Sequence, residues 1–230
     1  MRTCLCRSIM RVILLAMIPC LTIAQETESS TWALNSVDEV KSFGVNVSKV
    51  NYKGKESLRV DHKPGEQGEA SFAKLVDSDF KDGIIEFELA GKPGENAGQN
   101  ARGFVGIAFR INKDNSMFEC FYLRPTNGRA DDQLRRNHSC QYISFPDYPW
   151  YKLRQETPGK YESYVDLQPG EWTKVKIEVS GEKAMLYVHG SGQPCLIVND
   201  LKHGPDAQGT IGLWVAVGTE AYFSNLSVTK

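Results

Sequence analysis

One stretch of this sequence concentrates side chains that could bind or transform a polar ligand. It reads LRPTNGRADDQLRRNHSCQY, from Leu123 to Tyr142, and holds four arginines, two aspartates, two asparagines, two glutamines and a histidine. Arginine and amide groups offer several planar donors, and carboxylates accept hydrogen bonds. This inventory is typical of a site for a ligand rich in hydroxyl groups. Arginine and aspartate can also pair with each other and hold a long loop in shape, which is the alternative interpretation.

Aromatic residues follow the polar stretch closely. Seven of them lie between residues 142 and 164: Tyr142, Phe145, Tyr148, Trp150, Tyr151, Tyr161 and Tyr164. Sugars present fans of hydroxyls and apolar C–H faces, and the negative faces of aromatic rings suit those C–H groups. We therefore expect a carbohydrate as the ligand.

Asp131, Asp132 and His138 are the candidate catalytic residues. Glycoside hydrolysis uses two carboxyl groups facing one bond, about 5 Å apart for retention and further apart for inversion. Adjacent residues on an extended segment point in opposite directions, so the aspartates need a distant partner. The candidates for that partner are Glu119, Glu156 and Glu162. Calcium ligation or hydrogen bonding within the loop is the other interpretation of the two aspartates.

His138 is the one histidine of the stretch, and it could transfer a proton near neutral pH. Arg135 and Arg136 precede it directly. Their charge is expected to lower the pKa of His138 and to favour a neutral base. A purely structural histidine in a polar loop is the alternative. The same pair of arginines could bind the carboxylate or sulfate of an acidic glycan.

Short β-type segments separated by Gly, Asn, Asp and Pro position these residues. GIIEFELA (83–90) and EWTKVKIEV (171–179) alternate apolar and charged residues with the period of a half-buried strand. RGFVGIAFRI and SMFECFYLR read as a hairpin joined by NKDN, whose shared face would hold Arg110, Phe118, Tyr122 and Arg124. The expected ligand-binding residues are Arg110, Tyr122, Arg124, Asn127, Arg129, Gln133, Arg135, Arg136, Asn137, Gln141, Tyr148 and Trp150.

The pattern of segments predicts an all-β sandwich of two antiparallel sheets. Roughly a dozen strands are expected, with one short helical turn near 36–42. Residues 124–164 form an unusually long connection that is rich in aromatics, so we expect an ordered flap rather than a disordered one. No linker or repeat divides residues 25–230, which predicts a single domain.

The N-terminus has the features of a signal peptide. Arg2, Arg7 and Arg11 precede the apolar run 12–21, and Ala24 suits cleavage. A lipid anchor at Cys20 is the alternative. We expect residues 1–24 to be removed and the mature chain to be secreted or periplasmic. The net charge of −1 provides no global field to attract nucleic acid or a membrane surface, so neither is an expected partner.

Three cysteines, Cys120, Cys140 and Cys195, remain after the expected cleavage. They are interpreted as small buried residues, and at most one internal disulfide could form. Their spacing matches no zinc site, no cofactor is expected, and any structural calcium is left open. The sequence also lacks a phosphate-binding loop, a G-x-S-x-G elbow and an H-E-x-x-H motif, which disfavours phosphoryl transfer, triad hydrolysis and zinc peptidase chemistry.

The C-terminal third carries a family resemblance. WTKVKIEV at Trp172, LYVHGSGQPCLIVNDL and GTIGLWVAVGTEAYFSNLSV resemble the concanavalin A-like lectin/glucanase superfamily. Within it, residues 57–230 are most similar to bacterial secreted 3-keto-disaccharide hydrolase-like (laminin G-like) domains. The resemblance implies a jelly roll that binds glycans on its concave sheet. The E-x-D-x-x-E strand motif of laminarinases and the F-N-G-K-D-L-x-G-W opening of the keto-sugar branch are absent, so no catalytic residue transfers by motif.

Three functions follow from these observations. The first is an extracytoplasmic domain that binds or processes carbohydrate on the sheet and the flap. The second is a glycoside hydrolase, including one that cleaves 3-keto-glycosides, with an Asp or His of the flap as acid or base. The third is a structural or adhesive surface domain, which predicts that the charges of the flap pair internally and leave no open groove.

Overall fold

The computed structural model describes residues 28–63, 70–95, 97–98 and 101–230. The expected signal peptide, residues 1–24, lies outside the described residues. Among the residues that are described, no helix is long and apolar enough to cross a membrane.

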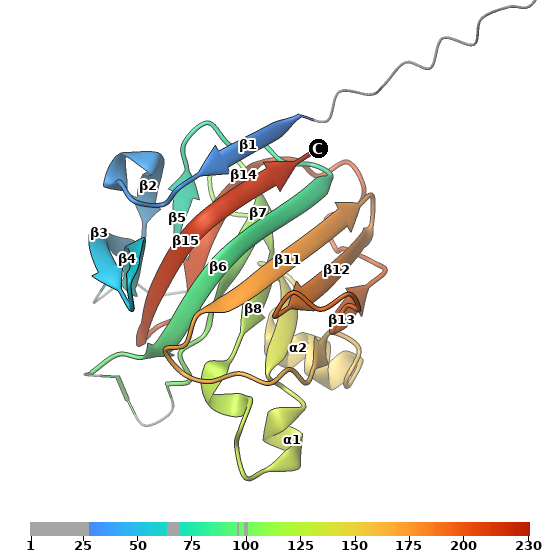
Figure 1. Cartoon of the computed structure of the whole chain (residues 1–230). Coiled ribbons are helices and arrows are strands. Elements are labelled where there is room, and N and C mark those ends of the chain that lie inside the picture. Colours follow the sequence, from blue (N-terminus) through green and yellow to red (C-terminus); the bar gives the residue numbers. More distant parts are fainter. Residues whose placement is uncertain (1–27, 64–69, 96, 99–100) are drawn as a thin grey trace, which may run out of the picture.

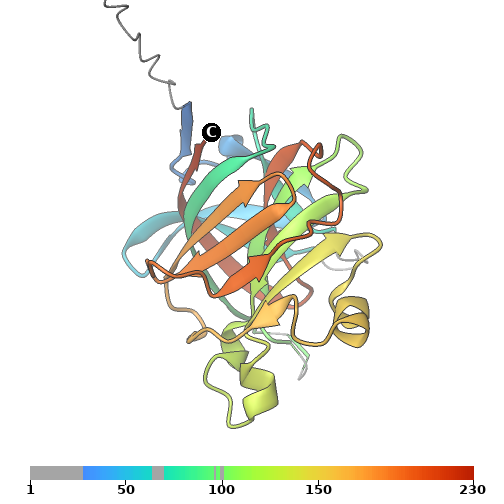
Figure 2. The same cartoon turned by 90° about the vertical axis from the view of Figure 1, so that its right-hand side faces the viewer.

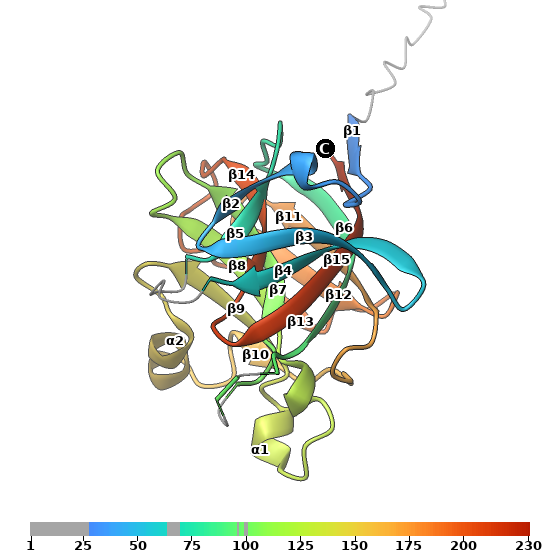
Figure 3. The same cartoon turned by 90° about the vertical axis from the view of Figure 1, so that its left-hand side faces the viewer.

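The described part of the chain is a sandwich of two antiparallel sheets (Figure 1). The eight-stranded sheet has the order β13-β12-β11-β6-β15-β4-β3, with β1 added beside β15. Its strands are β1 (Ser29–Trp32), β3 (Val45–Tyr52), β4 (Lys55–His62), β6 (Gly83–Pro93), β11 (Thr173–Ser180), β12 (Lys183–Val188), β13 (Leu196–Val198) and β15 (Thr219–Thr229). Because β1 pairs with β15, the first described residues lie beside the C-terminus (Figure 3).

The seven-stranded sheet has the order β10-β9-β8-β7-β14-β5-β2. Its strands are β2 (Val40–Phe43), β5 (Phe72–Leu75), β7 (Val105–Ile111), β8 (Phe118–Leu123), β9 (Cys140–Phe145), β10 (Glu162–Ser163) and β14 (Thr210–Val215). Four short helices complete the described elements: the 3₁₀ turns η1 (Val37–Glu39) and η2 (Pro125–Asn127), and α1 (Gln133–Arg136) and α2 (Trp150–Glu156). The all-β jelly-roll sandwich expected from the sequence is confirmed.

Alternation of side chains explains the central strands. Ile85, Phe87 and Leu89 of β6 are buried, whereas Glu86 is exposed. Val175 and Ile177 of β11 lie opposite Phe87 and Ile85 and are buried as well. Apolar residues at every second position therefore build the core between the two sheets, as the period of the sequence predicts.

The seven-stranded sheet has an inner and an outer face. Val105 of β7 lies against Gly91 of β6, where a β-carbon on the glycine would collide with it, so Val105 faces the eight-stranded sheet. Successive side chains point to opposite faces, which places Ile107 on the inner face and Gly106 and Ala108 on the outer face. The outer face is the one available for a site.

Residues 124–164 are ordered, but they are not one covering flap. They contribute the strands β9 and β10 to the seven-stranded sheet, and the remainder forms η2, α1, α2 and their connections. Figure 2 shows α1 and α2 at the lower end of the sandwich. The two helices were not expected, because four and seven residues are too few to show a helical period.

Candidate functional site

One row of residues crosses the outer face of the seven-stranded sheet. Trp214 lies directly opposite Gly106, Gly106 opposite Tyr122, Tyr122 opposite Gln141, and Gln141 opposite Glu162. Residues directly opposite one another in a sheet share a face, so this row brings together side chains that are far apart in the sequence.

Gly106 allows the two aromatic rings beside it to meet. The ring centroids of Tyr122 and Trp214 lie 4.9 Å apart, across a residue that has no side chain. A β-carbon at Gly106 would collide with the carbonyl oxygen of Phe121 in β8. The ring of Phe104, just before β7, lies 5.5 Å from that of Tyr122.

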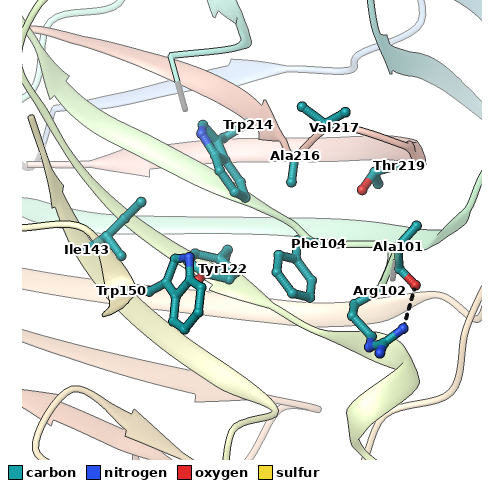
Figure 4. A pocket seen from close by; sticks show the side chains of 10 residues that line it. All are labelled: Ala101, Arg102, Phe104, Tyr122, Ile143, Trp150, Trp214, Ala216, Val217 and Thr219. Carbon is teal, nitrogen blue, oxygen red and sulfur yellow. Dashed lines mark hydrogen bonds between the residues drawn. The ribbon is translucent and has the colours of Figure 1, made fainter. Parts of the chain in front are cut away.

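An aromatic cavity of about 200 Å³ opens over these rings (Figure 4). Trp150 of α2 stands beside Tyr122, and the backbone and side chains of 101–104 and 216–219 form the remaining wall. Its lining residues are Ala101, Arg102, Phe104, Tyr122, Ile143, Trp150, Trp214, Ala216, Val217 and Thr219. Flat aromatic faces in this number suit the C–H face of a sugar ring.

A second cavity of about 560 Å³ adjoins the first, because both are lined by Arg102, Phe104 and Trp150. A third, of about 620 Å³, adjoins the second at Leu134, His138 and Arg154. The remaining residues of the second cavity are Arg124, Asn127, Asp132 and Arg135. We call the three adjoining cavities the groove. It runs from an aromatic end, through a section rich in arginine, toward α2 and β10.

Arg124 is the buried centre of the groove, with 4% of its side chain exposed. Its Nη2 donates to the hydroxyl of Tyr122 at 2.7 Å and to Oε1 of Gln141 at 3.1 Å, and its Nη1 donates to the carbonyl of His138 at 3.1 Å. The guanidinium also lies over the rings of Phe104, Tyr122 and Trp150, 5.0 to 5.7 Å from their centroids. Its Nε is buried and finds no acceptor among the described residues.

Glu162 supplies the buried negative charge beside Arg124. It accepts three hydrogen bonds from Arg154, two from Nε at 3.0 and 3.1 Å and one from Nη2 at 2.6 Å, and lies 3.7 Å from Nη1 of Arg124. Nδ1 of His138 lies 2.8 Å from Oε2 of Glu162 but is not aligned for a hydrogen bond. Three side chains therefore share one carboxylate.

The surroundings of His138 keep it neutral at neutral pH. Burial lowers its pKa, and the charges of Arg154 and Arg124 lower it further, against the opposing effect of Glu162. The direction agrees with the expectation from the sequence, but the arginines responsible are not Arg135 and Arg136. His138 lines both the second and the third cavity, and its Nε2 makes no hydrogen bond within the described part of the chain.

The two aspartates do not form a catalytic pair. Asp132 caps the N-terminus of α1, where its Oδ1 accepts from the backbone N–H of Arg135 at 2.6 Å, and it lines the second cavity. Asp131 is exposed and is not among the lining residues of the groove. Among the candidates for a distant carboxylate, Glu162 lies at the groove, whereas Glu119 is buried and accepts hydrogen bonds from Tyr142 and from the backbone of His203.

Several predicted ligand-binding residues hold the loops in shape. Arg135 donates to Oδ1 of Asn127 and to the carbonyl of Thr126, and Asn127 donates to the carbonyl of His138. Gln141 is fully buried and donates to two backbone carbonyls while it accepts from Arg124. Arg135 and Asn127 still line the second cavity, so they combine both roles.

Other predicted residues lie at the edge of the groove or outside it. Arg129 pairs with Asp166 through two hydrogen bonds of 2.8 and 2.9 Å, and Arg136 donates to the hydroxyl of Tyr164. Neither arginine lines the groove. Gln133 donates to Oδ1 of Asn137, which lines the third cavity, whereas Tyr148 lies under Lys152 and Lys202.

Arg110 does not share the outer face with Tyr122, contrary to the expectation from the sequence. The register between β7 and β14 shifts so that Phe109 and Arg110 together oppose one residue, and Arg110 has a φ of 53°. Such a bulge breaks the alternation of side chains. The Arg110 side chain is fully buried and donates to the carbonyls of Lys81, Gly181 and Gly204 and to Asp82.

Phe104, Trp214 and Arg154 were not among the predicted site residues. Alternation in 209–218 offered one signal, because it places Trp214 on the face opposite to Leu213 and Val215. Alternation does not say which face carries a groove. Arg154 sits in a short helix whose orientation only the folded chain sets.

No group of three or more histidine, cysteine, aspartate or glutamate side chains that could hold a metal occurs in the described residues. All three cysteines within that part of the chain are free thiols, and Cys120 and Cys140 are buried.

The solved structures that resemble this chain include two from Bacillus subtilis. The carbohydrate-binding module CBM66 is 14% identical, with a TM-score of 0.52 over 81% of this chain and 96% of that one. A protein of unknown function with a galectin-like fold is 16% identical, with a TM-score of 0.51 over 86% of this chain and 94% of that one. At these identities the likeness concerns the fold alone. No protein-family model and no curated protein matches the sequence.

Proposed function

We propose that this protein binds carbohydrate in the groove. The observation that carries the proposal is the arrangement of Phe104, Tyr122, Trp150 and Trp214 around one cavity that continues into a section lined by arginines. Sugar binding uses aromatic faces for C–H groups and fixed polar groups for hydroxyls, and both lie side by side here. The fold shared with a carbohydrate-binding module supports the proposal.

The polar side chains of the groove are held in place before any ligand arrives. Arg124 is fixed by three hydrogen bonds, and Arg154 by the carboxylate of Glu162. Side chains that are already ordered lose little entropy on binding, which favours affinity. The pairing of charges expected for an adhesive domain is present between Arg129 and Asp166, but the groove is open, which that alternative did not predict.

A glycan array followed by isothermal titration calorimetry tests the proposal. Trp150→Ala is expected to weaken binding at least tenfold, because it removes a ring that lines two of the three cavities. Tyr151→Ala is the matched control, since Tyr151 is the next residue of α2, is 59% exposed and lines none of the cavities. Equal loss in both variants, or no binding to any glycan, would contradict the proposal.

A glycoside-cleaving hydrolase is the second candidate, and the pair of His138 and Glu162 favours it. Glu162 lies 2.8 Å from Nδ1, and the lowered pKa leaves the histidine able to accept a proton at neutral pH. In this mechanism His138 acts as the base, the charge of Glu162 stabilises its protonated form, and Asp132 is occupied as a helix cap.

Turnover of oligosaccharides and 3-keto-glycosides separates the enzyme from a binding domain. We expect His138→Asn to abolish turnover while glycan binding persists. Asp131→Asn serves as the control, because Asp131 is exposed and lines none of the cavities, and it is expected to retain activity. Turnover that survives in His138→Asn would exclude the assigned base.

A further inference from the structure

The middle of the groove carries an excess of positive charge. Four arginines line the second cavity, Arg102, Arg124, Arg135 and Arg154, against one carboxylate, that of Asp132. His138 adds no charge at neutral pH because its pKa is lowered. The protein as a whole has a net charge of −1, so this excess is local.

Within the described part of the chain, the carboxylates at the groove, Asp132 and Glu162, are fewer than the four arginines. Asp132 uses Oδ1 to cap α1, and Glu162 is bonded mainly to Arg154, with Arg124 further away at 3.7 Å. The hydrogen-bond partners of Arg124 are a hydroxyl, an amide and a carbonyl, all of them neutral. Buried charges in proteins are normally paired, so a guanidinium that shares one carboxylate with a stronger competitor is under-compensated.

The unpartnered Nε of Arg124, like the excess of positive charge, indicates an anionic ligand. This atom is buried and has no acceptor among the described residues. A planar guanidinium binds a carboxylate or a sulfate through two donors at once, and such bonds are about twice as strong as neutral ones. A neutral sugar hydroxyl would leave the excess charge unbalanced.

We infer that the groove selects an anionic sugar, one that carries a carboxylate or a sulfate ester, with the anion in the arginine-lined cavity and the sugar ring on the aromatic cavity. This inference rests on the proposed carbohydrate binding and specifies its ligand class. Arg102, Phe104 and Trp150 line both cavities, so one sugar unit can reach the arginines and the rings together.

Paired glycans on an array, followed by calorimetry, test the inference on the purified protein. The pairs are oligogalacturonate and its methyl ester, a glucuronate-containing oligosaccharide and its carboxyl-reduced form, and a sulfated galactan oligosaccharide and its desulfated form. We expect at least one anionic member to bind about tenfold or more tightly than its neutral counterpart, with affinity falling as salt rises. The pair whose anionic member binds more tightly shows whether the groove recognises a carboxylate or a sulfate.

Arg102→Gln is expected to lower the affinity for the anionic ligand about fivefold and the affinity for its neutral counterpart less than twofold, because the substitution removes a charge from the wall of the second cavity and keeps a polar side chain there. Lys113→Gln is the matched control. Lys113 is exposed in the turn between β7 and β8, at the end of these strands opposite to Arg124, and should leave both affinities unchanged.

Neutral members that bind as tightly as their anionic partners would overturn this inference and leave carbohydrate binding intact. Absence of binding to every glycan, anionic or neutral, would overturn both. Equal weakening by Arg102→Gln and Lys113→Gln would show a general charge effect rather than a site and would also refute the inference.

Discussion

Replacing Glu162 by glutamine tests the charge arrangement on which the groove depends. The carboxylate has 3% of its side chain exposed and faces donors of Arg154 at 2.6 Å and Arg124 at 3.7 Å, and Nδ1 of His138 at 2.8 Å. Both arginine partners are donors, so a glutamine must place its own N–H₂ donors toward at least one of them, whichever way the amide is turned. The substitution keeps the shape and removes the charge.

Removing one partner of a buried ion pair costs about 3–5 kcal/mol of the free energy of unfolding. Glutamine retains one acceptor oxygen, and the Arg154 side chain is 31% exposed and can be hydrated, so we expect the lower end of that range, about 3 kcal/mol. Urea unfolding followed by tryptophan fluorescence measures it. Glu156→Gln is the control: it is an exposed residue of α2, and a change below about 0.5 kcal/mol is expected.

The same variant also moves the titration of His138. The charge of Glu162 raises the pKa of this histidine against burial and the two arginines, so Glu162→Gln should lower the pKa of His138 further. An NMR titration of the imidazole protons measures the shift. A variant as stable as the unmodified protein, or one in which the pKa of His138 rises, would refute the reasoning about this cluster.

Three further predictions concern the titration of His138, the packing at Gly106 and the thiols of Cys140 and Cys195. The pKa of His138 is lowered in the folded state, so as the pH falls the unfolded chain takes up this proton first. The free energy of unfolding should therefore lose none of this contribution above about pH 6.5 and should decrease as the pH falls below it. In urea unfolding at several pH values, His138→Asn should reduce that decrease. Gly106→Ala should cost about 1–3 kcal/mol by forcing β7 away from β8, whereas Gly192→Ala, with open space around it, should cost far less, and equal losses would contradict this account. The neighbouring thiol of Cys195, beside β13, raises the pKa of Cys140 in β9, so the two thiols should form a disulfide under mild oxidation and raise the free energy of unfolding by about 2–4 kcal/mol. Peptide mapping that finds both thiols still free after diamide treatment would exclude it.

Local periodicity was sufficient to predict the sandwich. The alternation in 83–90 and 171–179 predicted β6 and β11, and the hairpin read in 102–124 is β7 with β8. These predictions succeed because a strand with one buried face shows a period of two in its own sequence, whatever the rest of the chain does. The same reasoning found the polar and aromatic inventory of 124–164, since composition does not depend on the fold.

Local patterns therefore establish the class of the fold and the kinds of side chain that its longest connection carries. Which of these side chains meet depends on how the chain folds. A single extra residue in β7 turns Arg110 away from Tyr122, while the register of five strands places Trp214, Tyr122 and Glu162 on one face. The physical reason is that a one-residue shift of register reverses every side chain beyond it, and no local pattern encodes the register between strands a hundred residues apart.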